Sequence, residues 1–130
     1  MSNYFKQFFG LIIFTLVLLS AKGQKLILFD SSELTTKTEL NLLNTTKRGI
    51  EDETKTLFYV EKDLQTLSAY QNGLLKWKIN IIKTFGAAKV GRQEIRYIKL
   101  ENDQLIVTYG KHTFAKVNIH TGKGIFLGSD

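Results

Sequence analysis

The sequence predicts an all-β protein made of antiparallel meanders, with a strand segment before them. From Thr56 onward, short runs of apolar and β-branched residues alternate with polar turns. The chain has no proline that would interrupt a strand. After Thr56, no stretch repeats its apolar residues with the period of a helix.

The first part of the chain has the pattern of a secretory signal peptide. Lys6 precedes an apolar run over residues 8–19, and the small residues Ala21 and Gly23 follow. This run is about a dozen residues, whereas a membrane-spanning helix needs about 20. We therefore expect cleavage after Gly23 rather than an uncleaved anchor. The chain has no cysteine to carry a lipid at this site.

Removal of residues 1–23 leaves residues 24–130, which we expect to form a single all-β domain with one hydrophobic core. Without cysteine, this exported domain must be stabilised by apolar burial and sheet hydrogen bonds, and thiolate metal ligands are excluded. The formal net charge is +6, but the lysines are scattered and form no basic stripe. This pattern favours a solvated surface over nucleic-acid binding.

Residues 25–50 are expected to supply the N-terminal strand segment. Residues 25–29, KLILF, are a short apolar run before a polar turn, which predicts a strand. Residues 33–46 fit no period cleanly, and their five threonines disfavour a helix, so we expect a strand or an irregular strand. Residues 47–55 are polar and contain Gly49, which predicts a loop.

The first meander is predicted over residues 56–82. Its strands TLFYVEK, LQTLSAYQ and LLKWKINII are separated by the turns Lys62-Asp63 and Asn72-Gly73. Asn-Gly favours a type I′ hairpin turn, because both residues tolerate a positive φ. In the last strand, alternation predicts one buried face. That face carries Leu75, Trp77, Ile79 and Ile81.

The second meander is predicted over residues 94–128, after a connection at residues 84–93. Its strands are expected at residues 94–101, 104–109, 112–119 and 123–127. The turns between them are Asn102-Asp103, Gly110-Lys111 and residues 120–122.

The two meanders resemble each other in sequence. Phe58 and Val60 recur after 47 residues as Leu105 and Val107. After the second hairpin the spacing is 49 residues: Gly73 corresponds to Gly122, and Trp77 to Phe126. A repeat of this kind predicts that both units bury the same positions.

The repeated pattern resembles the blades of PQQ-like and related β-propellers, whose signature runs roughly A-x-D-x-x-T-G-x-x-x-W. Ala69, Gly73 and Trp77 match it in the first unit, with Gln71 in place of the aspartate. The second unit matches at Asn118, Thr121 and Gly122, with Phe126 in the tryptophan position. The resemblance implies packing and turn roles for these residues.

A propeller needs about four to eight blades to close, and this chain has two such units. We therefore expect an incomplete ring that joins other chains or has lost blades; the alternative is a compact β-sandwich or small barrel. The quinone-dependent enzymes of this superfamily use a complete ring to hold their cofactor and calcium. We expect neither here.

The sequence predicts no catalytic, cofactor-binding or metal-binding residues. His112 and His120 lie at opposite ends of one predicted strand, about 26 Å apart. Residues 51–53, EDE, are a carboxylate cluster without the spacing of a calcium loop. Ser68 has no evident base to activate it.

Two functional hypotheses lead, ahead of a third, a small hydrolase. The first is a non-enzymatic, periplasmic or extracellular accessory or scaffold protein of a Gram-negative cell envelope, which binds a partner protein or itself through its sheet edges and contacts the membrane at most peripherally. The second is a carbohydrate or small-ligand binding module that uses an exposed aromatic sheet face. Its aromatic side chains would come from Tyr59, Tyr70, Tyr97 and Tyr109.

Overall fold

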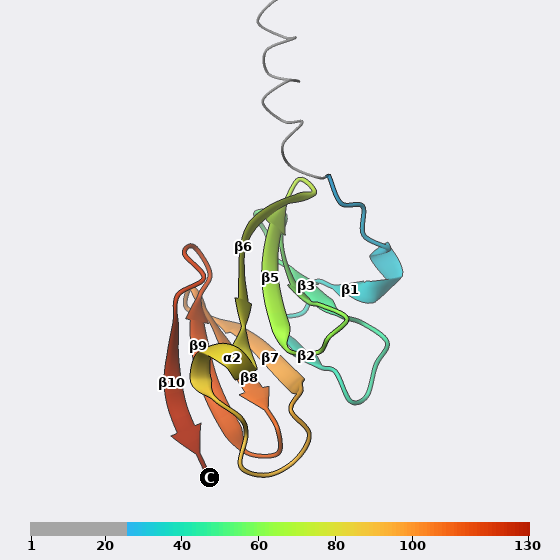
Figure 1. Cartoon of the computed structure of the whole chain (residues 1–130). Helices are drawn as coiled ribbons and strands as arrows, with labels where there is room; N and C mark the ends of the chain where they lie inside the picture. Colours follow the sequence, from blue (N-terminus) through green and yellow to red (C-terminus); the bar gives the residue numbers. More distant parts are fainter. Residues whose placement is uncertain (1–25) are drawn as a thin grey trace, which may run out of the picture.

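The computed structural model describes residues 26–130 and is drawn in Figure 1. The predicted signal peptide, residues 1–23, lies outside the described residues. The described chain forms two open five-stranded sheets that are mostly antiparallel, which confirms the all-β prediction. Among residues 26–130, no helix is long and apolar enough to cross a membrane.

The first sheet has the strand order β1-β3-β4-β5-β6. Its last four strands form a meander, and β1 pairs with β3 in the parallel direction. The strands are β1 (Leu34–Thr35), β3 (Gly49–Glu51), β4 (Thr56–Val60), β5 (Thr66–Gln71) and β6 (Leu74–Asn80).

The second sheet has the order β10-β9-β8-β7-β2, and all its pairs are antiparallel. Four consecutive strands again form a meander, which β2 extends from the N-terminal part of the chain. The strands are β2 (Glu39–Asn41), β7 (Ile95–Glu101), β8 (Gln104–Tyr109), β9 (Thr113–Asn118) and β10 (Gly124–Ser129). Both predicted meanders are therefore present.

Two of the predicted hairpin turns have the backbone that their sequences favour. Asn72 and Gly73 join β5 to β6 with φ of 53° and 77°. Asn102 and Asp103 join β7 to β8 with φ of 49° and 63°. Positive φ at both central residues defines the type I′ turn, whose twist matches that of the strands.

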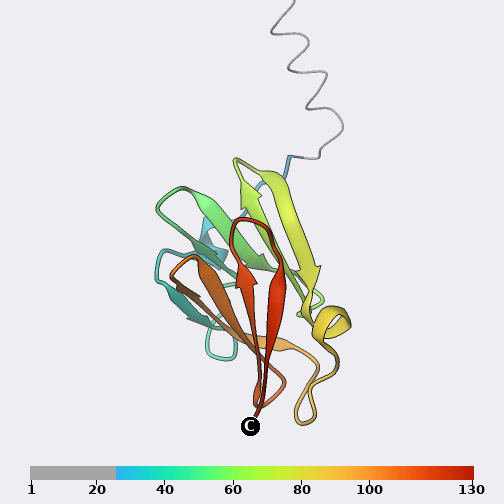
Figure 2. The ribbon, with the colours of Figure 1, turned by 90° about the vertical axis from the view of Figure 1, so that its left-hand side faces the viewer.

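The two sheets share one hydrophobic core. Figures 1 and 2 show the paths of the strands in the two sheets. Its side chains come from alternate positions of strands in both sheets. The first sheet contributes Ile50, Phe58, Val60, Leu67, Ala69 and Trp77. The second contributes Leu40, Ile95, Ile98, Leu105, Val107, Tyr109, Ala115 and Val117.

A second, smaller cluster lies on the outer face of the first sheet. Leu57, Tyr59 and Tyr70 are buried there beneath the chain before β1. Phe29 lies between the two tyrosines, with ring centroids 4.9 Å from Tyr59 and 4.8 Å from Tyr70. We call residues 26–30 the N-terminal strap, because they cover this face without joining its sheet.

The prediction of a strand at residues 25–29 is therefore wrong for the described residues 26–29. Ile27 and Phe29 pack against the outer cluster, whereas the side chain of Leu28 is 90% exposed. One backbone hydrogen bond holds the segment, from the Ile27 N–H to the Gly73 carbonyl at 2.8 Å. The segment lies over a sheet face, where no ladder of backbone groups is available to pair with it.

The predicted loop at residues 47–55 contains a strand, β3. Ile50 is buried in the main core, and Gly49 lies so close to β4 that an added Cβ would be 2.9 Å from the Leu57 side chain. The polar composition concealed this strand, because Ile50 is its only apolar side chain beside Gly49 and Glu51.

The last strand of the first meander is shorter than predicted. β6 ends at Asn80, and Ile81–Phe85 form a short helix, α2, inside the predicted strand and connection. The Asn80 side chain caps this helix by accepting a hydrogen bond from the Lys83 N–H at 2.9 Å. Ile81 remains buried, but as a helical residue.

The predicted buried face of β6 is wrong at Leu75. Trp77 pairs with Ala69 and Leu75 pairs with Tyr70, so Lys76 is the extra residue of a β-bulge. The bulge changes the alternation, and Leu75 is 40% exposed while Trp77 is buried. The structure therefore confirms the predicted burial of Trp77 but not that of its neighbour.

Candidate protein interface

Each sheet ends in two edge strands, and three of the four offer little to a pairing strand. β1 and β2 have two and three residues. β6 is longer, but it carries exposed Lys76 and Lys78 as well as the bulge. Short length, lysines and bulges are the features that prevent unwanted pairing at sheet edges.

The fourth edge strand, β10, has the opposite character. Its sequence, GIFLGS, contains no charged residue, and in Figure 2 it lies toward the viewer. Ile125 is 58% exposed, and Phe126 and Leu127 are each 48% exposed. Among residues 26–130 no strand pairs with the outer edge of β10, and this edge carries three consecutive exposed apolar side chains.

A bulge lies at the end of this exposed run. Phe126 pairs with Ala115 and Gly128 pairs with Phe114, so Leu127 is an extra residue on β10. The bulge therefore concerns only Leu127, whereas Ile125 and Phe126 pair regularly with β9 and are exposed on either side of the edge strand. Phe126 makes one aromatic contact, with Phe85 of α2, at a centroid separation of 6.4 Å.

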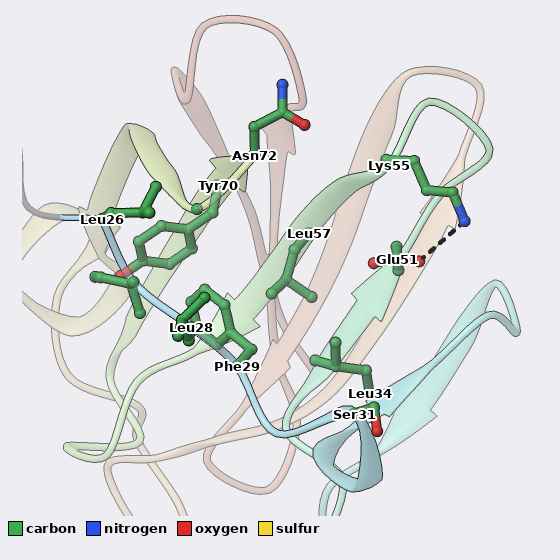
Figure 3. Close-up of a pocket in the computed structure, with 12 residues that line it drawn as sticks. Leu26, Leu28, Phe29, Ser31, Leu34, Glu51, Lys55, Leu57, Tyr70 and Asn72 are labelled. Atoms are coloured by element: carbon green, nitrogen blue, oxygen red, sulfur yellow. Dashed lines mark ion pairs between the residues drawn. The ribbon is translucent and has the colours of Figure 1, made fainter. Parts of the chain in front are cut away.

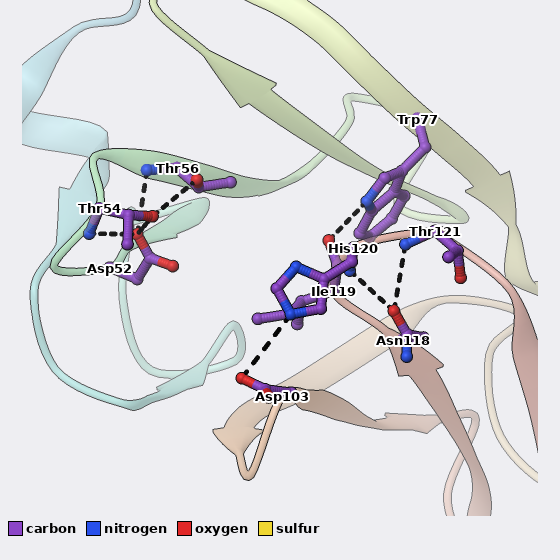
Figure 4. A network of polar contacts seen from close by, with 9 residues as sticks. All are labelled: Asp52, Thr54, Thr56, Trp77, Asp103, Asn118, Ile119, His120 and Thr121. Carbon is purple, nitrogen blue, oxygen red and sulfur yellow. Dashed lines mark hydrogen bonds and ion pairs between the residues drawn. The ribbon is translucent and has the colours of Figure 1, made fainter.

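The turn before β10 is fixed by the first sheet, as Figure 4 shows. The Trp77 Nε1–H donates a hydrogen bond to the Ile119 carbonyl at 2.8 Å. Gly122 lies under the indole ring, where an added Cβ would be 2.7 Å from Trp77. The one tryptophan of the chain thus anchors the β9–β10 hairpin, while the strand beyond the turn stays exposed.

The repeat comparison is therefore wrong for Phe126. It occupies the tryptophan position of the second unit, yet it lies at the surface. The earlier pairs behave as predicted: Phe58, Val60, Leu105 and Val107 are all fully buried.

A crevice of about 520 Å³ lies at one end of the two sheets, between residues 36–38, 51–55 and 102–103. The Asp52 carboxylate accepts hydrogen bonds from the backbone of Thr54 and Thr56 at 2.9 and 3.0 Å. The Glu51 carboxylate lies 3.6 Å from the Lys55 ammonium group. Residues 26–130 contain no group of three or more metal-ligating side chains.

The two histidines lie apart. His120 is exposed, with its Nε2 3.9 Å from Asp103 (Figure 4), and His112 is exposed at the β8–β9 turn. Ser68 is fully buried on β5, and its hydroxyl has no hydrogen-bond partner among the described residues. A buried serine without a base cannot attack a substrate.

A shallow groove of about 500 Å³ lies between the strap and the first sheet, as seen in Figure 3. Its lining is mainly apolar and includes Leu26, Leu28, Leu34, Leu57 and Tyr70, with the Glu51–Lys55 ion pair at one end. The strap forms one wall of this groove. We therefore interpret the groove as the gap between the strap and the sheet face that it covers, and not as a separate binding site.

The tyrosines do not form an exposed aromatic face. Tyr59 and Tyr70 are buried under the strap and donate hydrogen bonds to Glu33 and Glu61 at 2.7 and 2.6 Å. Burial, together with these carboxylates, raises the pKa of each phenol to about 12. Tyr109 is in the main core, and Tyr97 is half-buried on β7, where it donates a hydrogen bond to Glu39 at 2.7 Å. Of the four tyrosines only Tyr97 is partly exposed, so these four side chains do not form the expected aromatic face.

The sequence analysis predicted that sheet edges bind a partner, but it did not predict which edge strand is free of charge and exposed. The absence of charge from GIFLGS was the available signal, since the other long edge strand carries two lysines. The contact between Phe85 and Phe126 could not be anticipated, because the helix α2 that carries Phe85 was not predicted.

Comparisons of the chain with protein-family models, curated proteins and solved structures gave no match.

Proposed function

We propose that this chain is a non-enzymatic binding protein, an accessory or scaffold component of the cell envelope, that pairs a strand of its partner with β10. The observation that carries the proposal is the uncharged β10 edge with exposed Ile125, Phe126 and Leu127. The export expected from the signal-peptide pattern supports a location in the periplasm or at the cell surface.

The mechanism is strand addition. The outer side of an edge strand presents backbone N–H and C=O groups without partners, which an extended segment can satisfy. The added strand would also cover apolar side chains of β10, and each buried CH₂ group contributes about 0.8 kcal/mol. Backbone pairing supplies affinity, and the side chains at the bulge supply selectivity.

Chemical crosslinking in the native envelope tests the proposal with two matched variants. Phe126→Lys places a charge on β10, while Leu75→Lys places one on β6 at a side chain of similar exposure. We expect Phe126→Lys to lose the crosslinked species and Leu75→Lys to keep it. Equal crosslinking by both variants, or a wild-type chain that crosslinks to nothing and stays monomeric, would overturn the proposal.

A further inference from the structure

We infer that the strand paired with β10 is the β10 strand of a second copy of this chain, in the antiparallel direction. This inference rests on the proposed function, because it names the partner of the same edge. The evidence is the placement of two charges around an otherwise uncharged strand.

Lys123 immediately precedes β10, and Asp130 immediately follows it. Both residues are exposed, and neither forms an ion pair with another residue of 26–130. A two-fold axis between Phe126 and Leu127 brings each Lys123 opposite Asp130 of the other copy. Opposite charges that face each other across an antiparallel pair stabilise it.

The same register gives every other residue of the strand a compatible neighbour. Phe126 faces Leu127 of the other copy, so the exposed apolar side chains cover one another. Ile125 faces Gly128, where an added Cβ would meet nothing within 4 Å, so the larger side chain has room. Gly124 faces Ser129, which is also a small pair.

Other arrangements lose the charge match. A shift of one residue in either direction moves Lys123 away from Asp130 and also exchanges the faces of the side chains. A parallel pair would place Lys123 beside Lys123 and Asp130 beside Asp130. The antiparallel register centred between Phe126 and Leu127 is therefore the favoured one.

Pairing through β10 stops at a dimer. A two-fold axis uses the same edge in both chains, so β10 is no longer available once the pair has formed. The opposite edge of the same sheet is the three-residue β2, and β6 carries lysines. A contact of six residues from each chain is smaller than a standard interface, so we expect a weak dimer that depends on concentration.

Charge reversal tests the register by sedimentation velocity over a range of concentrations. We expect Lys123→Glu and Asp130→Lys each to weaken dimerisation about tenfold, because each replaces two attractive pairs with two repulsive ones. The double variant should restore wild-type association. Lys76→Glu, the same charge change on β6, is the control and should change nothing. Single reversals without effect, or a double variant that is not rescued, would overturn the register.

Cysteine trapping tests the direction, because the chain has no cysteine of its own. Antiparallel neighbours have Cα atoms about 4.5 to 5.5 Å apart, within the range of a disulfide. A mixture of Lys123→Cys and Asp130→Cys chains should oxidise to the mixed dimer, and each chain alone should not. Disulfides within the Lys123→Cys sample alone would indicate parallel pairing and overturn the inference.

Failure of the inference can be separated from failure of the proposed function. A purified chain that stays monomeric up to millimolar concentration, with Phe126-dependent crosslinking still present in the envelope, would overturn self-pairing and leave the proposed function standing. If Phe126→Lys changes neither the dimerisation nor the crosslinking, both are wrong. Loss of dimerisation in Phe126→Lys, with charge-swap rescue at positions 123 and 130, supports both.

Discussion

Both meanders end in an edge strand, but the two edge strands differ in the burial of their aromatic residue and in charge. β6 sends Trp77 into the core and presents lysines at its edge. β10 leaves Phe126, 49 positions later, at the surface and presents no charge. A repeated sequence position therefore does not fix burial, because the residues that pack against each strand determine it.

The surface that packs against Trp77 matches its side chain in shape and in hydrogen bonding. Gly122 leaves room for the indole ring, and the Ile119 carbonyl accepts its N–H. Phe126 stacks at 6.4 Å on Phe85 of α2, but it remains 48% exposed. The last strand of the first meander is therefore covered by the second sheet at Trp77, whereas the last strand of the second meander stays exposed at Phe126.

Trp77→Ala should have the largest effect on stability. Removal of a buried aromatic side chain costs about 3 to 5 kcal/mol, and here it also leaves the Ile119 carbonyl without its donor. Chemical denaturation measures the loss. Phe126→Ala, the matched change on β10, should cost less than about 1 kcal/mol because the side chain is half exposed. Equal losses would show that the two positions are equivalent after all.

Phe29→Ala should have the next largest effect, because it opens the outer face of the first sheet. The ring contacts Tyr59 and Tyr70, and its loss should cost about 2 to 3 kcal/mol. Leu28→Ala, one residue earlier on the strap, removes a side chain that is 90% exposed and should be nearly neutral. Thermal unfolding of the pair tests this, and a neutral Phe29→Ala would show that the strap does not seal the sheet.

Gly122→Ala should destabilise the fold by about 1 to 2 kcal/mol. The residue has φ of 74°, and its new Cβ would meet the Trp77 ring. Gly128→Ala shares the positive φ, 114°, but has open space around it, so it reports backbone strain alone. A larger loss for Gly122→Ala in denaturant titrations would measure the contact between the two sheets. Equal losses of stability would show that the contact between Gly122 and Trp77 does not add to the cost of backbone strain.

Alkaline pH should weaken the fold through the covered tyrosines. The pKa of Tyr59 and that of Tyr70 are raised to about 12, while an unfolded phenol titrates near 10.0. Between these values the unfolded chain loses protons that the native chain retains, so stability is complete below about pH 10 and falls as pH rises toward 12. Tyr59→Phe and Tyr70→Phe should each flatten this fall in denaturation measured at increasing pH, and an unchanged slope would contradict the assignment.

Much of the fold follows from local patterns. The turns at Asn72-Gly73 and Asn102-Asp103 depend on a few neighbouring residues, and the structure has them as predicted. The bulges at Lys76 and Leu127 do not follow from local patterns, because each depends on how its strand pairs with the neighbouring strand. Phe126 pairs with the fully buried Ala115 and yet is 48% exposed, so the candidate interface could not be located by alternation alone.

The most direct test of the contrast between the two edges is amide hydrogen exchange at low and high protein concentration. β10 is predicted to be the open edge that pairs with a second copy, and β6 is predicted to be closed to pairing. Amides of residues 124–129 should therefore exchange more slowly as concentration rises, while amides of β6 should exchange at an unchanged rate. Protection that increases on β6, or on neither strand, would contradict the account.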